Sequence, residues 1–98
     1  MRTNNIKTKE SKMKKTFPNM GKLLLETREK AEKSLKIMAN DFPFTAQFIH
    51  NIEKGKANMP IHGQKILMEL YGVDLIDLQA ASINDFIENY NREVTHVS

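Results

Sequence analysis

Four side chains between positions 46 and 51 are of kinds that recognise another molecule by hydrogen bonding. Gln47 and Asn51 lie four residues apart, and Ala46 and His50 stand beside them at the same spacing. Residues four apart share one face of a helix. An amide can donate to and accept from adenine at the same time, and a histidine can donate to guanine. The chemistry predicted for this face is the reading of base edges in a DNA major groove.

The residues that catalysis or metal binding requires are scattered along the chain or missing from it. There are three His, at positions 50, 62 and 96, and no Cys, and the four Gly form no phosphate-binding loop. The His spacing does not match a metal site, and no nucleophile is paired with a base in the sequence. We therefore expect no enzymatic activity, no cofactor and no metal site.

A base-reading face needs a helix that other elements hold in place, and the apolar spacing predicts such a pair. Ser34 is placed to cap a short helix that ends near Asp41, before Pro43 interrupts the chain. Thr45 is placed to cap a second helix that ends near Lys54, with Gly55 suited to a left-handed position after it. A helix pair of this kind can lay its second helix into a major groove, and an αα-corner in any small bundle has the same pattern. Three residues at or just past the end of the second helix are placed to contact phosphates: Lys54, Lys56 and Asn58.

Every other element that the sequence indicates is also helical, so the predicted fold class is all-α. The first helix is expected from Asn19, as its N-cap, to about Lys33. Further helices are expected from about Ile61 to Gly72 and, briefly, around Leu75 and Leu78. A chain of 98 residues has room for one small core, and it lacks an apolar run long enough for a membrane span. We expect a soluble, cytoplasmic protein.

Charge is distributed unevenly along the chain. Residues 1–16 hold six Lys or Arg and one Glu and lack a hydrophobic period, which predicts a flexible basic arm. From residue 66 onward one Arg stands against six acidic residues. A basic arm that includes Lys14 and Lys15 would be attracted to a phosphate backbone, and the acidic end would turn away from it. A Lys-rich tail that is merely solvated has the same composition.

The C-terminal part of the chain carries an apolar stripe at helical spacing. Ser82 and Asp85 resemble a capping pair at its start. We expect a separate helix inside a C-terminal unit of residues 81–98, following a domain of residues 17–80. The stripe is expected either to dock on the rest of the chain or to contact a partner, and we favour a second copy of the chain. Its members are Ile83, Phe86, Ile87, Tyr90 and Val94.

Four stretches of the sequence together match a known pattern. They are Met20-Gly21 to Arg28, Ser34 to Ala39, Thr45 to Lys56 with Pro60, and Leu70-Tyr71-Gly72-Val73-Asp74-Leu75. With these stretches the chain resembles the Cro and repressor-type (XRE, lambda-repressor-like) helix-turn-helix family of DNA-binding regulators. The resemblance implies a five-helix all-α domain, a two-fold dimer on a palindromic operator and a third helix in the major groove.

The resemblance also implies roles for individual positions. Gln47 and Asn51 fall where the family reads bases, with Ala46 and His50 beside them. Thr45 falls near a phosphate, as do Ser34 and the arm residues Lys14 and Lys15 in the same interpretation. Arg28 and Glu53 fall where family members form an internal ion pair, so we assign both to structure. Glu32 replaces a usual Gly, which predicts a longer first helix, and Pro43 stands where the family turn prefers Gly.

A narrower resemblance rests on about a third of the chain. Residues 47–56, 63–67 and 70–75 are similar to the antitoxins of Hip-type toxin–antitoxin modules, which bind their own operator as dimers and hold a kinase-like toxin. We therefore expect a transcriptional repressor of its own operon, associated with the nucleoid. The alternative is a protein-interaction module that neutralises a toxin or binds a regulator, with DNA binding secondary.

Overall fold

The computed structural model describes residues 14–96, and every regular element in that part of the chain is an α-helix. This confirms the all-α class. Residues 1–13, most of the expected basic arm, lie outside the described residues. None of the helices within 14–96 is long and apolar enough to cross a membrane. The helices are α2 (Pro18–Lys30), α3 (Leu35–Ala39), α4 (Ala46–Glu53), α5 (Ile61–Tyr71) and α6 (Leu75–Thr95).

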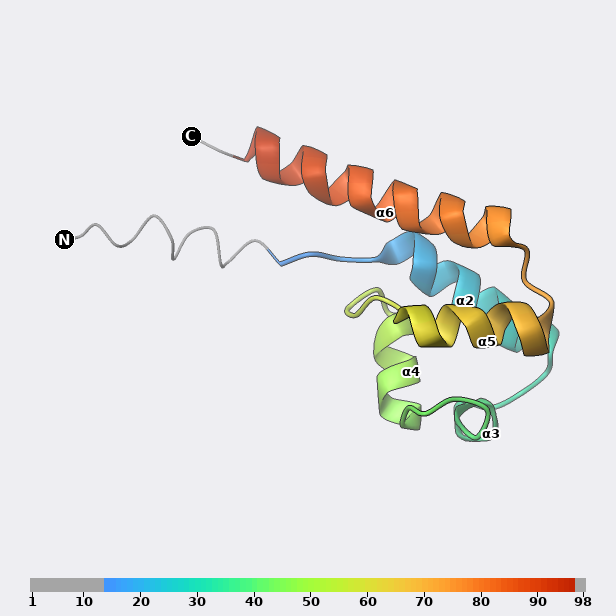
Figure 1. The fold of residues 1–98 in the computed structure, drawn as a ribbon. Coiled ribbons are helices and arrows are strands. Elements are labelled where there is room, and N and C mark those ends of the chain that lie inside the picture. The colour runs from blue at the N-terminus through green and yellow to red at the C-terminus, as the bar shows by residue number, and fades with distance from the viewer. Residues whose placement is uncertain (1–13, 97–98) are drawn as a thin grey trace.

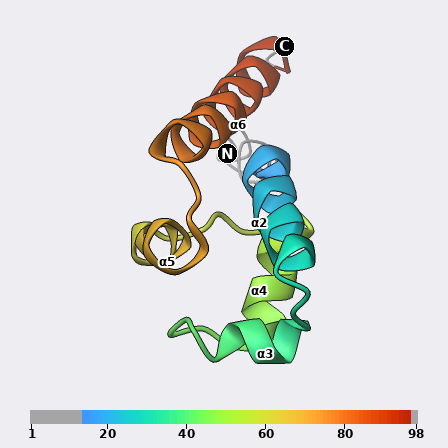
Figure 2. The same ribbon diagram turned by 90° about the vertical axis from the view of Figure 1, so that its right-hand side faces the viewer.

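Helix α2 is the centre of the fold, because both α4 and α6 pack against it. Figures 1 and 2 place α6 at one end of the molecule and α3 at the opposite end, with α2 and α4 between them. Three of the completely or almost completely buried side chains are Met20, Met38 and Met59. Because methionine is unbranched, it fills the irregular spaces left between short helices. The other buried apolar residues are Leu24, Phe42, Ile49, Ile52, Leu67, Leu78 and Ala81.

The two ends of α2 differ from the prediction. Pro18 is the first helical residue, at a position where a backbone N–H would have no partner within the helix. Asn19 therefore lies in the first turn and is not the N-cap. The helix ends at Lys30 and not near Lys33. Glu32 adopts a left-handed conformation with φ of 56°, and the Lys33 N–H donates to the Arg28 carbonyl at 3.2 Å. This closes the helix as a glycine would, so the expectation of a longer helix is wrong.

Both caps predicted for the central helix pair are present. The Ser34 hydroxyl accepts from the Ile37 N–H, and the Thr45 hydroxyl accepts from the Phe48 N–H, each at 3.1 Å. Helix α3 is two residues shorter than expected and ends at Ala39. Gly55 follows α4 with φ of 79°, in the left-handed region, as predicted. Capping explains why these short helices begin where they do, because it satisfies backbone donors that a helix leaves free.

The C-terminal part of the chain is organised differently from the prediction. Residues 75–95 form one continuous helix, α6, so the brief helix at Leu75 and the separate helix at Ser82 are a single element. The boundary expected between residues 80 and 81 therefore falls inside this helix. Asp85 does not cap its own helix, since its carboxylate accepts hydrogen bonds from the start of α2.

The apolar stripe of α6 does not dock on the rest of the described chain. Its side chains are 46–68% exposed, from Ile87 at the lower limit to Phe86 at the upper one. The helix packs instead through its opposite face, where Leu78, Ala81, Asp85 and Asn89 are buried. Intramolecular docking of the stripe is thus wrong, and the five stripe residues contribute little to the stability of a single chain.

Candidate nucleic-acid interface

Helix α4 is held with one face against the core. Ile49 and Ile52 are completely buried on that face. On α2, Gly21 faces the end of α4 so closely that a Cβ atom there would lie 2.5 Å from the Ile52 carbonyl oxygen. The two backbones can approach to this extent because glycine has no side chain. The contact holds the C-terminal end of α4 against α2.

An ion pair joins the last turns of α2 and α4. Arg28 contacts Glu53 through two hydrogen bonds, Nε to Oε2 at 2.6 Å and Nη2 to Oε1 at 3.1 Å. The third donor, Nη1, binds the Lys33 carbonyl at 3.0 Å. The hydrogen bond to Glu53 raises the pKa of Arg28 above its ordinary value. The pair expected from the resemblance is therefore present, and it connects α4 to the turn that precedes α3.

The four residues predicted to read bases lie on the side of α4 away from Ile49 and Ile52. Gln47 is exposed, and Ala46, His50 and Asn51 are partly exposed. The Gln47 Nε2 amide donates to the Asn51 Oδ1 atom at 3.1 Å. This bond orients the two amides before any ligand binds, and it leaves further donors and acceptors on both side chains.

The predicted phosphate contacts form two groups. Ser34 and Thr45 are exposed at the N-termini of α3 and α4, where free backbone donors favour an anion. Lys54 and Lys56 are exposed at the C-terminal end of α4. Thr45, Lys54 and Lys56 therefore lie at the two ends of the helix that carries the base-reading side chains, and Ser34 begins the preceding helix.

Three other predicted phosphate contacts lie along α6. Lys15 and Asn58 line a groove together with Asp85 and Phe86 of that helix. Asn58 also accepts the Met59 N–H at 3.0 Å. The Lys14 carbonyl accepts from Arg92 Nη2 at 3.0 Å. The structure therefore does not group these residues with the exposed face of α4.

The end of the expected flexible arm is bound to α6. The Asn89 amide pairs with Thr16, donating to its carbonyl at 2.8 Å and accepting its N–H at 3.0 Å. Residues 14–16 are thus held by side chains of α6, which corrects the expectation that the arm extends to residue 16. Asn89 is a polar residue in a helix, and the sequence gives no signal for a partner 73 residues away.

A second polar cluster, which sequence reasoning missed, supports α3 from α5. Lys33 Nζ lies 3.0 Å from Asp41 Oδ2 and donates to the Tyr71 hydroxyl at 3.2 Å, and that hydroxyl donates to Asp41. The hydrogen bond from Tyr71, followed by that from Lys33, lowers the pKa of Asp41 below its ordinary value. Burial and the bond to Asp41 raise the pKa of Tyr71. Helix α3 separates Lys33 from Asp41, and 30 residues separate Asp41 from Tyr71, so spacing in the sequence does not reveal the cluster.

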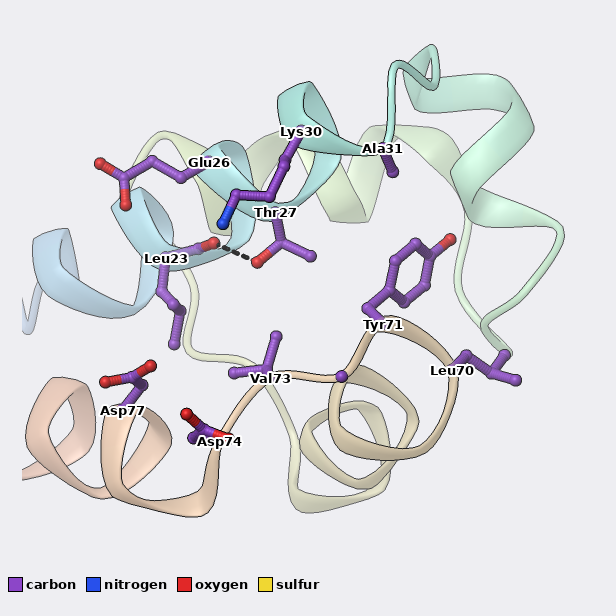
Figure 3. Close-up of a pocket in the computed structure, with 11 residues that line it drawn as sticks. Leu23, Glu26, Thr27, Lys30, Ala31, Leu70, Tyr71, Val73, Asp74 and Asp77 are labelled. Carbon is purple, nitrogen blue, oxygen red and sulfur yellow. Dashed lines mark hydrogen bonds between the residues drawn. The ribbon is translucent and has the colours of Figure 1, made fainter.

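A further groove lies between α2 and the linker that joins α5 to α6. Figure 3 shows Leu23 and Val73 pointing toward one another across it, while Glu26, Asp74 and Asp77 stand at its rim. The Thr27 hydroxyl donates to the Leu23 carbonyl of the same helix at 2.8 Å. Within residues 14–96, no three His, Asp or Glu side chains gather closely enough to hold a metal ion.

Comparisons of this chain with protein-family models, with curated proteins and with solved structures find no match.

Proposed function

We propose that the chain binds double-stranded DNA sequence-specifically, with α4 in the major groove and α3 as the supporting helix of a repressor-like helix-turn-helix. Two copies on a palindromic operator would repress transcription, most simply of the chain's own operon. The observation that carries the proposal is the exposed face of α4, where Gln47 and Asn51 are oriented by a mutual hydrogen bond of 3.1 Å. Paired amides of this kind suit the N6 and N7 edge of adenine.

The distribution of charge supports the same proposal. Lys54 and Lys56 are exposed beside α4. The acidic residues of α6 lie at the other end of the molecule from α3 (Figures 1 and 2). DNA bound along α3 and α4 would meet the basic side of the chain and avoid the acidic helix, which lowers the electrostatic cost of binding.

Selection from a random duplex library tests the proposal. The selected duplex should be palindromic and preferred over a scrambled duplex by about a thousandfold, measured by titration at two salt concentrations. Gln47→Ala and Asn51→Ala should each weaken binding to it by about 1 to 3 kcal/mol and relax the preference at one base position. The control is Thr95→Ala, which removes an exposed, uncharged polar side chain at the end of α6. Equal binding of both duplexes by the wild-type chain would refute base reading.

A second function is favoured by apolar side chains that DNA would leave uncovered. On α5, Ile61 is 70% exposed and Leu70 is 62% exposed. A protein-interaction module, such as an antitoxin that holds a kinase-like toxin, would use such residues. One unrelated protein should then copurify with the chain from its host in fixed proportion and be lost with Leu70→Asp. DNA binding by that variant would be unchanged.

A further inference from the structure

The exposed face of α6 has a longer and more regular pattern than the stripe predicted from the sequence. Six positions alternate at spacings of four and three residues, which is the heptad spacing of a two-helix coiled coil. All six are exposed, with Ile76 at 74% and Ile83 at 55%. We call this set the α6 seam. Its members are Ile76, Ala80, Ile83, Ile87, Tyr90 and Val94.

The seam lies on the side of α6 opposite its contact with α2. Leu78, Ala81, Asp85 and Asn89 are the buried residues of the helix. At 3.6 residues per turn, the six seam positions centre on the reverse face. A partner can therefore cover the seam without displacing α2. It also leaves α4 free, because α4 and α6 pack on opposite sides of α2 (Figures 1 and 2). The polar contacts with residues 14–20 already order α6, which reduces the entropy that pairing would cost.

The seam is complementary to itself in one orientation. Its positions are symmetric about residue 85, so in an antiparallel pair Ile76 faces Val94, Ala80 faces Tyr90 and Ile83 faces Ile87. The antiparallel pair has two Ala80–Tyr90 layers, and in each of them the smallest seam residue lies against the largest one. A parallel pair would set Ala80 against Ala80 and Tyr90 against Tyr90, which leaves a void in one layer and crowds another.

The residues that flank the seam agree with antiparallel pairing. Phe86 comes beside its own copy near the two-fold axis, and its ring already stacks on Tyr90 with centroids 6.2 Å apart. Asp77 comes near Asn91 of the second copy, and Glu93 comes near Gln79. No like charges meet in this register among residues 76–94. Isoleucine at positions 76 and 83 also disfavours a parallel two-stranded coil, which prefers leucine at the equivalent positions.

We propose that α6 pairs antiparallel with α6 of a second copy of this chain through the seam, about a two-fold axis at residue 85. The inference rests on the two-copy part of the proposed function and names the contact that forms it. Measurements without DNA keep its failure distinct from a failure of base reading. A variant that loses the dimer and keeps its fold should still bind a single half-site through α4.

Sedimentation of the full-length chain tests the pairing. The wild type should sediment at twice the mass of one chain at micromolar concentration, with a melting temperature that rises with protein concentration. Ile83→Glu should raise the dimer dissociation constant by at least about a hundredfold, because each dimer carries the change twice. Leu75→Glu is the matched control, since Leu75 is 53% exposed on the same helix outside the seam. A monomeric wild type, or equal loss with both variants, would overturn the proposal.

Cross-linking tests the orientation, and the absence of cysteine from the chain makes the result unambiguous. With Ala80→Cys and Tyr90→Cys combined, a short thiol cross-linker should yield a covalent dimer. With Ala80→Cys alone it should not, because the two copies of position 80 are about 15 Å apart in the antiparallel register at 1.5 Å per residue. The same distance prevents linkage between positions 80 and 90 within one helix. A covalent dimer from Ala80→Cys alone would show a parallel pair and contradict the register.

Discussion

Helix α2 holds α4 on one side and α6 on the other, and the two contacts are made by different means. Against α4, Gly21 brings the backbones together beside Ile52, which is completely buried. Against α6, the buried Asp85 carboxylate accepts the N–H groups of Asn19 and Met20 at 2.8 and 3.0 Å. The first contact is close packing of two backbones, with the Arg28–Glu53 ion pair at its end. The second depends mainly on hydrogen bonds to a buried carboxylate.

The two kinds of contact have different consequences for α4 and for α6. Close packing leaves α4 little freedom to tilt, and the proposed binding of α4 in a DNA groove would require such a fixed orientation. The Asp85 contact caps α2 and benefits from the positive end of that helix, so few apolar side chains of α6 need to be buried. The apolar residues of α6 thus stay exposed in the seam. The same helix can be fixed to the fold on one face and offer the other to a partner.

The largest effect is expected at the close-packed contact. Gly21→Ala should lower the free energy of unfolding by about 3 kcal/mol, because the new methyl group would meet backbone carbonyls that have no room to move. The control is Lys22→Ala at the next residue of α2, where the side chain is exposed. The control should lower the free energy of unfolding by clearly less than Gly21→Ala does. Urea denaturation measures both, and equal losses would show that the approach of α2 to α4 is not tight.

Breaking the polar contact should have a smaller and more local effect. Asp85→Ala should cost about 2 kcal/mol, because the first donors of α2 lose a buried acceptor. Hydrogen exchange should quicken in α6 and at Thr16, and it should change little in α4. The control is Glu88→Ala, which removes an exposed acid of α6 that binds Asn19 Nδ2 at 3.1 Å. Equal acceleration in α4 and α6 would mean that the two contacts are not separable.

The smallest effect is expected at the partly exposed cluster that joins α3 to α5. Tyr71→Phe should cost about 1 kcal/mol near pH 7, since Asp41 loses a hydrogen-bond donor. The pKa of Asp41 is lowered in the folded chain, so its contribution is present above the ordinary value of 3.8 and is lost as the pH falls through the folded value.

A pH series sharpens this last comparison. The stability difference between the wild type and Tyr71→Phe should shrink as the pH falls below 3.8, the ordinary pKa of Asp41. Tyr90→Phe is the control, because Tyr90 is 57% exposed and lies in the α6 seam. Its effect on the stability of the single chain should be near zero at every pH. If the stability difference between the wild type and Tyr71→Phe did not change with pH, the hydrogen bond to Asp41 would not be its cause.

Much of the local structure is predictable from the sequence alone. The caps at Ser34 and Thr45 and the left-handed Gly55 all depend on residues within four positions of each other. The side chains on the exposed face of α4 follow from the same period. The pairing of Arg28 with Glu53 came from the resemblance, because 25 residues separate the partners.

Helical spacing in the sequence by itself determined that the chain is all-α and which residue types lie on the exposed face of α4. The tertiary structure decided which face of α6 is buried. An apolar stripe predicts burial, yet Asp85 and Asn89 bind backbone groups more than 60 residues away and turn the polar face inward. It also decided that Glu32 makes a left-handed turn and that Gly21 is a contact point. These features depend on contacts between residues that are far apart in the sequence, so the local spacing of residues does not predict them.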